Sequence, residues 1–161
     1  MSRKFALIIG NSEYNDKNLA CLKTPAADVR ALAEVLLDST RGGFNEALTL
    51  INESDSIIRK AIERFFARKK SDDLLLLYFS GHGVVDDQGR LYLAAQDTEY
   101  ELWTASAIPA TFITDSMDRS QSRRQVLILD CCHSGAFFRG TKAVTGVKAV
   151  TEMTFEGKGY G

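Results

Sequence analysis

The sequence predicts a three-layer α/β/α sandwich with a mostly parallel central sheet. Three short apolar runs, at residues 5–9, 74–79 and 126–129, recur along the chain. None of them alternates between apolar and polar residues, and continuous runs of this length are typical of strands buried on both faces. Segments with helical periodicity lie between the runs, and this alternation favours a parallel sheet covered by helices.

The first helix is predicted from the segment TPAADVRALAEVLLD. Thr24 is its expected N-cap and Pro25 its first helical residue. Its apolar stripe has three- and four-residue spacing and consists of Val29, Leu32, Val35 and Leu36. The spacing indicates an amphipathic helix with one face on the sheet.

The remaining elements follow in order. A weaker strand is expected at residues 47–51, and the segment DSIIRKAIERFFARKK predicts a second helix, with Asp55 near its start. We expect this helix to end with three basic residues that suit its dipole, namely Arg68, Lys69 and Lys70. A small hairpin strand in RLYLAA and a short helix in TFITDSMDRSQS complete the predicted order before the last strand.

Composition limits the classes of protein and partner. The chain has 161 residues, of which 45% are hydrophobic and 25% charged, the balance of one soluble globular domain. A formal net charge of -1 disfavours nucleic acid and anionic membrane as partners. The apolar start is too short for a secretory signal, and no run approaches a membrane span of about 20 residues. Three cysteines without a disulfide pattern fit a reducing compartment, so we expect a cytoplasmic protein.

Chemically active residues follow two of the predicted strands. The run 74–79 leads into SGHG, which contains His82, and the run 126–129 leads into DCCHSG, which contains Cys131, Cys132 and His133. Ligands and active sites of parallel sheets lie at the carboxyl ends of the strands. If the two strands are neighbours, about 4.8 Å apart, a histidine and a cysteine from distant segments meet at one edge.

A cysteine beside a histidine can perform acyl transfer. The thiolate is the nucleophile, and the imidazole takes its proton and later donates one to the leaving group. Gly81 and Gly83 would allow a substrate backbone to approach His82, and the amides of Gly83 and Cys132 could hold an oxyanion. His133 is poorly placed to act as the base for its sequence neighbour.

Other interpretations remain open for these residues. Each one alone has a structural explanation, since a histidine between glycines often belongs to a turn and a buried cysteine behaves as a small hydrophobe. We expect one of the two adjacent cysteines to face the edge of the sheet and the other to pack into the core. Zinc binding by the cysteines and histidines, and a redox role, are disfavoured because zinc ligands and redox cysteines are usually separated by intervening residues.

The two motifs resemble those of a known family. YFSGHG, followed about 50 residues later by LILDCCHSGAF, is similar to the histidine and cysteine motifs of caspase-like cysteine peptidases, closest to the metacaspase and bacterial caspase-homologue branch. FALIIGNSEY resembles the family's first strand and loop, and TPAADVRALAEVL its first helix. The resemblance implies an endopeptidase with Cys132 as nucleophile and His82 as base, and it leaves Cys131 at a variable position.

The resemblance also implies a substrate preference. In caspases the position of Asp130 is a glutamine, and an arginine of the first loop helps to bind a substrate aspartate. Here the loop NSEYNDKNLACLKTP contains no arginine, and an anionic pocket floor at Asp130 favours a guanidinium or ammonium. We therefore predict cleavage after Arg or Lys in a specificity (S1) pocket formed by Asp130, Ser80 and a loop acid, Glu13 or Asp16.

Calcium is the cofactor that the resemblance raises, because metacaspases often need it. Asp97 and Asp115 lie about where two ligands would be, but Thr114 and Ser116 flank Asp115, and Arg139 stands where a further acid is needed. Since Ca²⁺ takes six to eight oxygens, we expect no strong calcium site and no other metal or cofactor.

The family's full catalytic domain continues beyond the length of this chain. We therefore expect residues 1–140 to form the catalytic core of a large subunit and residues 141–161 to be a flexible tail or the start of an inter-subunit linker. A small subunit, from the remainder of the same zymogen, would supply the last strands and cover an apolar edge. The expected partners are thus a peptide or protein substrate, this small subunit and a possible regulatory protein.

The resemblance implies a biological role and leaves one rival to it. Bacterial homologues suggest regulated proteolysis in cell death or antiphage defence, with activation by processing or by a partner. The alternative is a catalytically silent caspase-like adaptor. Possession of both His82 and Cys132 argues against the adaptor, because a pseudoenzyme has no need of them.

Overall fold

The computed structural model describes residues 1–133, and of Cys132 and His133 it describes only the backbone. The described chain forms β1 (Lys4–Gly10), α1 (Pro25–Leu37), β2 (Glu46–Ile51), α2 (Asp55–Phe66) and β3 (Leu74–Val85). These are followed by β4 (Leu91–Leu93), a 3₁₀ turn (Tyr100–Leu102), α3 (Trp103–Ser106), β5 (Ile108–Pro109), α4 (Ala110–Arg119) and β6 (Arg124–His133). The predicted tail, residues 141–161, lies outside the described residues.

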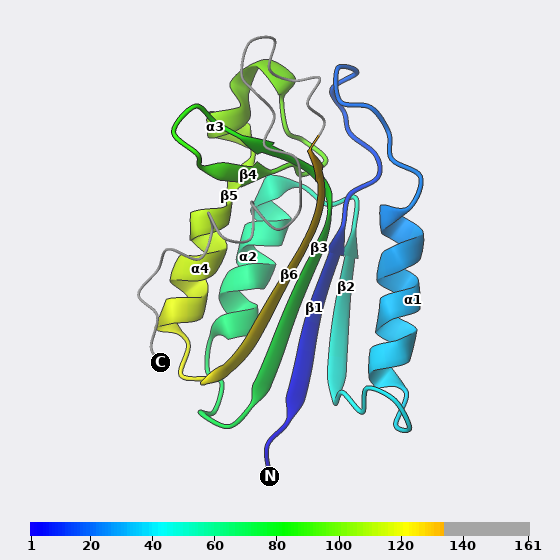
Figure 1. Cartoon of the computed structure of the whole chain (residues 1–161), viewed down its shortest axis with the longest axis vertical. Helices are drawn as coiled ribbons and strands as arrows, with labels where there is room; N and C mark the ends of the chain where they lie inside the picture. The colour runs from blue at the N-terminus through cyan, green and yellow to red at the C-terminus, as the bar shows by residue number, and fades with distance from the viewer. Residues whose placement is uncertain (134–161) are drawn as a thin grey trace.

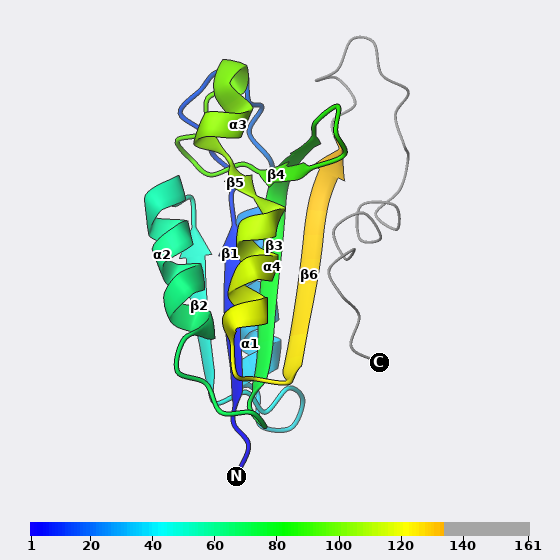
Figure 2. The ribbon, with the colours of Figure 1, turned by 90° about the vertical axis from the view of Figure 1, so that its left-hand side faces the viewer.

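The predicted three-layer α/β architecture is confirmed. Strands β2, β1, β3 and β6 lie side by side and run parallel, whereas β4 and β5 continue the sheet antiparallel from the far end of β3. Helix α1 covers one face of the sheet, and α2 and α4 cover the other (Figures 1 and 2). The sheet is therefore mixed, with a parallel centre.

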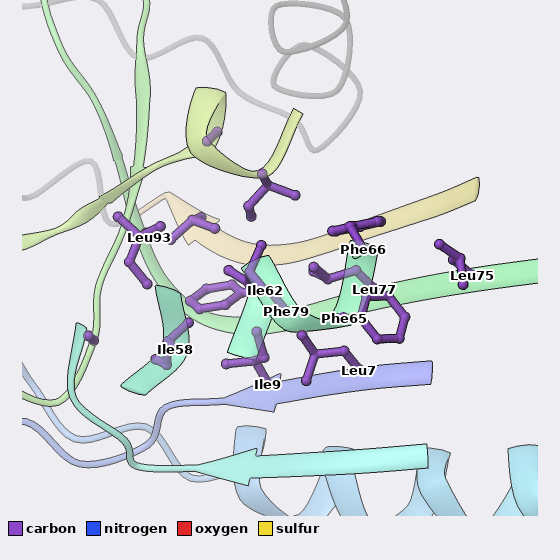
Figure 3. Close-up of a cluster of buried hydrophobic side chains, with 14 of the residues drawn as sticks. Leu7, Ile9, Ile58, Ile62, Phe65, Phe66, Leu75, Leu77, Phe79 and Leu93 are labelled. Carbon is purple, nitrogen blue, oxygen red and sulfur yellow. The ribbon is translucent and has the colours of Figure 1, made fainter. Parts of the chain in front are cut away.

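Burial on both faces explains the continuous apolar runs. Phe5, Leu7 and Ile9 of β1 belong to the cluster under α2 and α4, while Ala6 and Ile8 belong to the cluster under α1. Alternate side chains of a strand point to opposite faces, so a strand covered on both sides has no polar positions. Figure 3 shows the larger cluster, in which α2 side chains meet those of β1 and β3.

Helix α1 begins as predicted and α2 ends earlier than predicted. Pro25 is the first residue of α1, although the Thr24 side chain makes no capping hydrogen bond. Helix α2 is capped by Ser54 and stops at Phe66, because the next residue, Ala67, has an extended backbone with φ of -72° and ψ of 146°. The expected basic end of the helix is therefore wrong. The ammonium of Lys69 instead lies 4.5 Å from the centroid of the Phe5 ring.

Strand β6 has one neighbour, β3, among the described residues. Two of its apolar side chains, Val126 and Ile128, are 41% and 42% exposed on the sheet face that α1 covers elsewhere. An edge strand with exposed apolar side chains favours pairing with further chain. This edge is where the sequence predicts that additional strands belong.

Candidate active site

His82 and Cys132 occupy facing positions of two neighbouring strands. Both strands are longer than predicted, so these residues lie within β3 and β6 rather than just beyond their ends. The parallel register pairs Ser80 with Asp130, His82 with Cys132 and Gly83 with His133. Pairing between the two strands extends them through the glycine and polar segments. The predicted meeting of the two motifs at one edge is thus confirmed at the level of the backbone.

The loop that follows β1 holds the His82 imidazole. Its Nε2 lies 2.7 Å from the carbonyl oxygen of Ala20, and the side chain is only 4% exposed. A carbonyl can only accept a hydrogen bond, so Nε2 carries the hydrogen and the lone pair of the neutral ring belongs to Nδ1. The contact therefore selects the tautomer in which Nδ1 can act as a base.

The same loop also holds the backbone of His82. The amide of His82 donates to the Tyr14 hydroxyl at 3.1 Å, and that hydroxyl donates to the carbonyl of Asn11 at 2.7 Å. The Tyr14 and His82 rings lie against each other with centroids 5.0 Å apart. Neither Tyr14 nor Ala20 was predicted from the sequence. Tyr14 lies in the loop after the carboxyl end of β1, so the rule that sites form at the carboxyl ends of parallel strands could have found it. Ala20 acts through its main-chain carbonyl, which leaves no signal in the sequence.

Internal packing excludes a side chain at Gly83 and leaves little room for one at Gly81. A Cβ on Gly83 would lie 2.9 Å from the Cβ of Cys131, and one on Gly81 would lie 3.2 Å from the Tyr14 hydroxyl. Room for a substrate backbone, the predicted reason for these glycines, stays a prediction beside this packing reason. The predicted oxyanion role of the Gly83 and Cys132 amides stays a prediction.

The two adjacent cysteines, Cys131 and Cys132, lie at successive positions of β6. Cys131 is 6% exposed and belongs to the apolar cluster under α2 and α4, so the prediction that one cysteine packs into the core is confirmed. Cys132 is described by its backbone position opposite His82. The catalytic roles of Cys132 and His82 stay predictions.

Asp130 lies at the carboxyl end of β6 beside a buried tyrosine. The Tyr78 hydroxyl donates to Asp130 Oδ2 at 3.2 Å, and Ser80, the register partner of Asp130, is buried. Burial raises the pKa of Tyr78, and the nearby carboxylates of Asp130 and Asp28 add to this effect. Tyr78 therefore stays a neutral donor at physiological pH. Asp28, on α1, is a second acid of this region that was not predicted, because its proximity follows from how the helix packs on the sheet.

The predicted loop acids are placed less favourably for a pocket. Glu13 is exposed. Its backbone amide donates a 3.1 Å hydrogen bond to Asn52 Oδ1, and this bond does not involve its carboxylate. The carboxylate of Asp16 accepts from the amides of Tyr100 and Asn18, and these bonds lower its pKa. Asp16 therefore holds the loop in place, and Glu13 stays the predicted loop acid of the pocket.

The calcium positions considered above have other surroundings. Asp97 accepts a 2.7 Å hydrogen bond from the Asp55 amide at the start of α2, and Asp115 is exposed on α4. Arg139 lies outside the described residues. Within residues 1–133 no group of three or more His, Cys, Asp or Glu residues is arranged to hold a metal ion. No helix in the same part of the chain is long and apolar enough to cross a membrane.

Comparisons with known proteins bear on the family and the fold of the chain. A family model described as the caspase domain matches residues 3–157. Mucosa-associated lymphoid tissue lymphoma translocation protein 1 of Homo sapiens is 24% identical over 148 residues, 92% of this chain and 17% of that protein.

Solved structures share the fold. A protein from Geobacter sulfurreducens superposes with a TM-score of 0.64 at 19% identity, covering 83% of this chain and 52% of the other. Caspase-1 from Spodoptera frugiperda gives 0.61 at 18% identity, covering 81% and 48%. The chain thus spans about half the length of these two structures and less of the curated relative. Placement in the metacaspase branch stays a prediction. From the two motifs, the register that joins them and the match along almost its whole length, the chain belongs to the caspase domain family.

Proposed function

We propose that the protein is a cysteine endopeptidase in which Cys132 is the nucleophile and His82 the base. The observation that carries the proposal is the register of β3 and β6, which sets His82 opposite Cys132, combined with the Ala20 contact that leaves Nδ1 basic. Membership of the caspase domain family supports a peptide substrate.

The reaction follows from these groups. His82 Nδ1 takes the thiol proton of Cys132, and the thiolate attacks the carbonyl carbon of the scissile peptide bond. The amides of Gly83 and Cys132 are proposed to hold the resulting oxyanion. His82 then protonates the leaving amine as the C–N bond breaks and a thioester forms. Water, deprotonated by His82, hydrolyses the thioester and releases the carboxylic acid, which regenerates the Cys132 thiol.

A basic residue before the scissile bond suits the acids beside this site. Asp130 lies in β6 two residues before Cys132, Tyr78 donates to its carboxylate, and Asp28 contributes a second negative charge. A guanidinium or ammonium gains charge-assisted hydrogen bonds in such surroundings, and a substrate carboxylate is repelled. Ser80 and Glu13 are the further proposed members of the pocket.

A further chain segment is proposed to complete the particle. The open side of β6 and the exposed Val126 and Ile128 supply an edge for additional strands, and this chain covers only about half of each structure that shares the fold. The remainder of the same zymogen, as a small subunit, fits this edge and would form part of the pocket. Activation by processing or by a regulatory partner, and a role in bacterial cell death or antiphage defence, stay predictions.

Hydrolysis of fluorogenic peptides by the full-length protein tests the proposal. The substrates end in Arg, Lys or Asp, and the wild type is compared with Cys132→Ala and, as the matched control, Cys131→Ala. We expect cleavage of Arg and Lys peptides that Cys132→Ala abolishes and Cys131→Ala retains. Activity in Cys132→Ala, or preference for Asp peptides, would contradict the proposal. A folded wild type with no activity on any of the peptides would instead support the silent adaptor.

A further inference from the structure

We propose that Tyr14 is a positioning residue for the catalytic histidine, acting through its hydroxyl on the backbone of His82. The inference rests on the proposed role of His82 as the base. It concerns a residue outside both motifs, and its geometry can be tested separately from activity.

The Tyr14 hydroxyl accepts a hydrogen bond from β3 beyond the point where β1 stops pairing with it. Strand β1 pairs with β3 only as far as Gly10 opposite Ser80, and Asn11 adds one last bond from its amide to the carbonyl of Ser80 at 2.9 Å. The next amide on that side of β3 belongs to His82, and it donates to the Tyr14 hydroxyl. A buried amide without an acceptor costs about 1–3 kcal/mol, so the phenol fills a required place.

The hydroxyl is itself fixed in position. It donates to the Asn11 carbonyl at 2.7 Å, and it stands 3.2 Å from where a Cβ of Gly81 would be. The glycine therefore lets the phenol approach the strand. The carbonyl of His82 accepts from the amide of Ala94 at 2.9 Å, so both polar backbone groups of His82 are held. Asn11, which joins these contacts, is fully buried.

The loop that carries Tyr14 is anchored independently of it. The amides of Ser12 and Glu13 donate to Asn52 Oδ1 at 2.7 and 3.1 Å, and the amide of Asn15 donates to the carbonyl of Gln96 at 2.9 Å. Replacement of Tyr14 by Phe keeps the ring against His82 and leaves these anchors intact. The substitution therefore removes the hydroxyl alone.

Loss of the hydroxyl should affect the chemical step more than substrate binding. Proton transfer needs heavy atoms within about 2.6–3.2 Å, and a misplacement of about 1 Å can cost roughly 100-fold in rate. Because Tyr14 holds the backbone from which the imidazole extends, we expect Tyr14→Phe to lower kcat roughly tenfold with KM unchanged.

The test compares Tyr14→Phe with Tyr92→Phe in the full-length protein. Tyr92 is a buried tyrosine on β4, so the control deletes the same atom elsewhere. Kinetics on the Arg peptide are measured together with amide hydrogen exchange by NMR. We expect the kcat loss and at least fivefold faster exchange of the His82 amide in Tyr14→Phe only, with the Leu77 amide equally protected in all proteins.

Two outcomes would overturn the inference. One is wild-type kcat and wild-type exchange of the His82 amide in Tyr14→Phe, which would leave the proposed peptidase function standing. The other is a rise in KM with kcat unchanged, which would assign Tyr14 to substrate binding. If the wild type itself lacks peptidase activity, the proposed function fails, and unchanged exchange at His82 still refutes the placement of Tyr14.

Discussion

Replacement of Asp130 by Asn tests the proposed substrate preference most directly. Asn has nearly the same shape and keeps an oxygen that can accept from the Tyr78 hydroxyl, so the substitution removes the negative charge and little else. Because Asp130 is exposed, loss of its charge should not disturb the core.

The size of the effect follows from the surroundings of the carboxylate. Opposite unit charges at 4 Å attract by about 1 kcal/mol in water and about 4 kcal/mol at the effective dielectric constant of a protein surface, near 20. Because Asp130 is exposed, its attraction to a substrate cation should lie toward the lower value. The buried Tyr78 that donates to its carboxylate strengthens this attraction, since it lowers the local dielectric constant. About 1.4–2.7 kcal/mol corresponds to a loss of roughly 10- to 100-fold in kcat/KM on Arg peptides.

The assay measures kcat/KM on peptides that differ only in the residue before the scissile bond, which is Arg, Lys, Gln or Asp. We expect Asp130→Asn to lose activity on Arg and Lys peptides while activity on the Gln peptide changes less than threefold. Asp118→Asn removes the same charge from an exposed position on α4, outside the proposed pocket, and serves as the charge-matched control. Equal losses on Arg and Gln peptides would refute the electrostatic reasoning and assign Asp130 a structural role.

Three further predictions concern stability. Gly83→Ala places a Cβ 2.9 Å from the Cβ of Cys131 and should lower the free energy of unfolding in urea by about 1–3 kcal/mol. Gly81→Ala should cost less, because its nearest contacts are 3.2–3.3 Å away. Equal costs would contradict this account of the glycines. Ile62→Ala, in the fully buried cluster, should cost about 2–5 kcal/mol, whereas Ile57→Ala, on the exposed side of the same helix, should cost less than about 1 kcal/mol. Because its hydrogen bonds lower the pKa of Asp16, that carboxylate stabilises the fold above the ordinary aspartate range and loses this effect as the pH falls through its folded value. The urea midpoint should therefore drop between about pH 5 and pH 3, and the drop should be smaller in Asp16→Asn; an identical drop would exclude Asp16 as a contributor.

The fold could be predicted because helices cover both faces of the sheet at its central strands, β1 and β3. The apolar runs at 74–79 and 126–129 located β3 and β6, but the continuation of both strands could not be read from SGHG and DCCH. Those segments have the glycine and polar residues typical of loops. They form strands because they pair with each other. The end of α2 was missed because the basic run continues past Ala67, whose extended backbone ends the helix without a breaker residue in the sequence.

The candidate site was predictable where side chains carry the chemistry. His82 and Cys132 each follow an apolar run, and about 50 residues separate them in the sequence. The register of β3 and β6 confirms that their backbones face each other. The supports of His82 were not predictable, because one is the main-chain carbonyl of Ala20 and the other a phenol bound to an amide. Asp28 was missed because only the packing of α1 brings it near Tyr78.

The pairing of β6 with β3 has an alternative that folding must avoid. A slip by one residue would put Cys131 in the backbone position opposite His82 and would turn over the faces of the strand. The four apolar residues 126–129 resist such an error weakly, because either face of the sheet accepts them. Asp130 resists it strongly, since the slip would force its charge into the apolar cluster under α2 and α4 at a cost of several kcal/mol. The acid proposed to recognise the substrate therefore also protects against misfolding, and it decides which of two adjacent cysteines stands opposite the histidine.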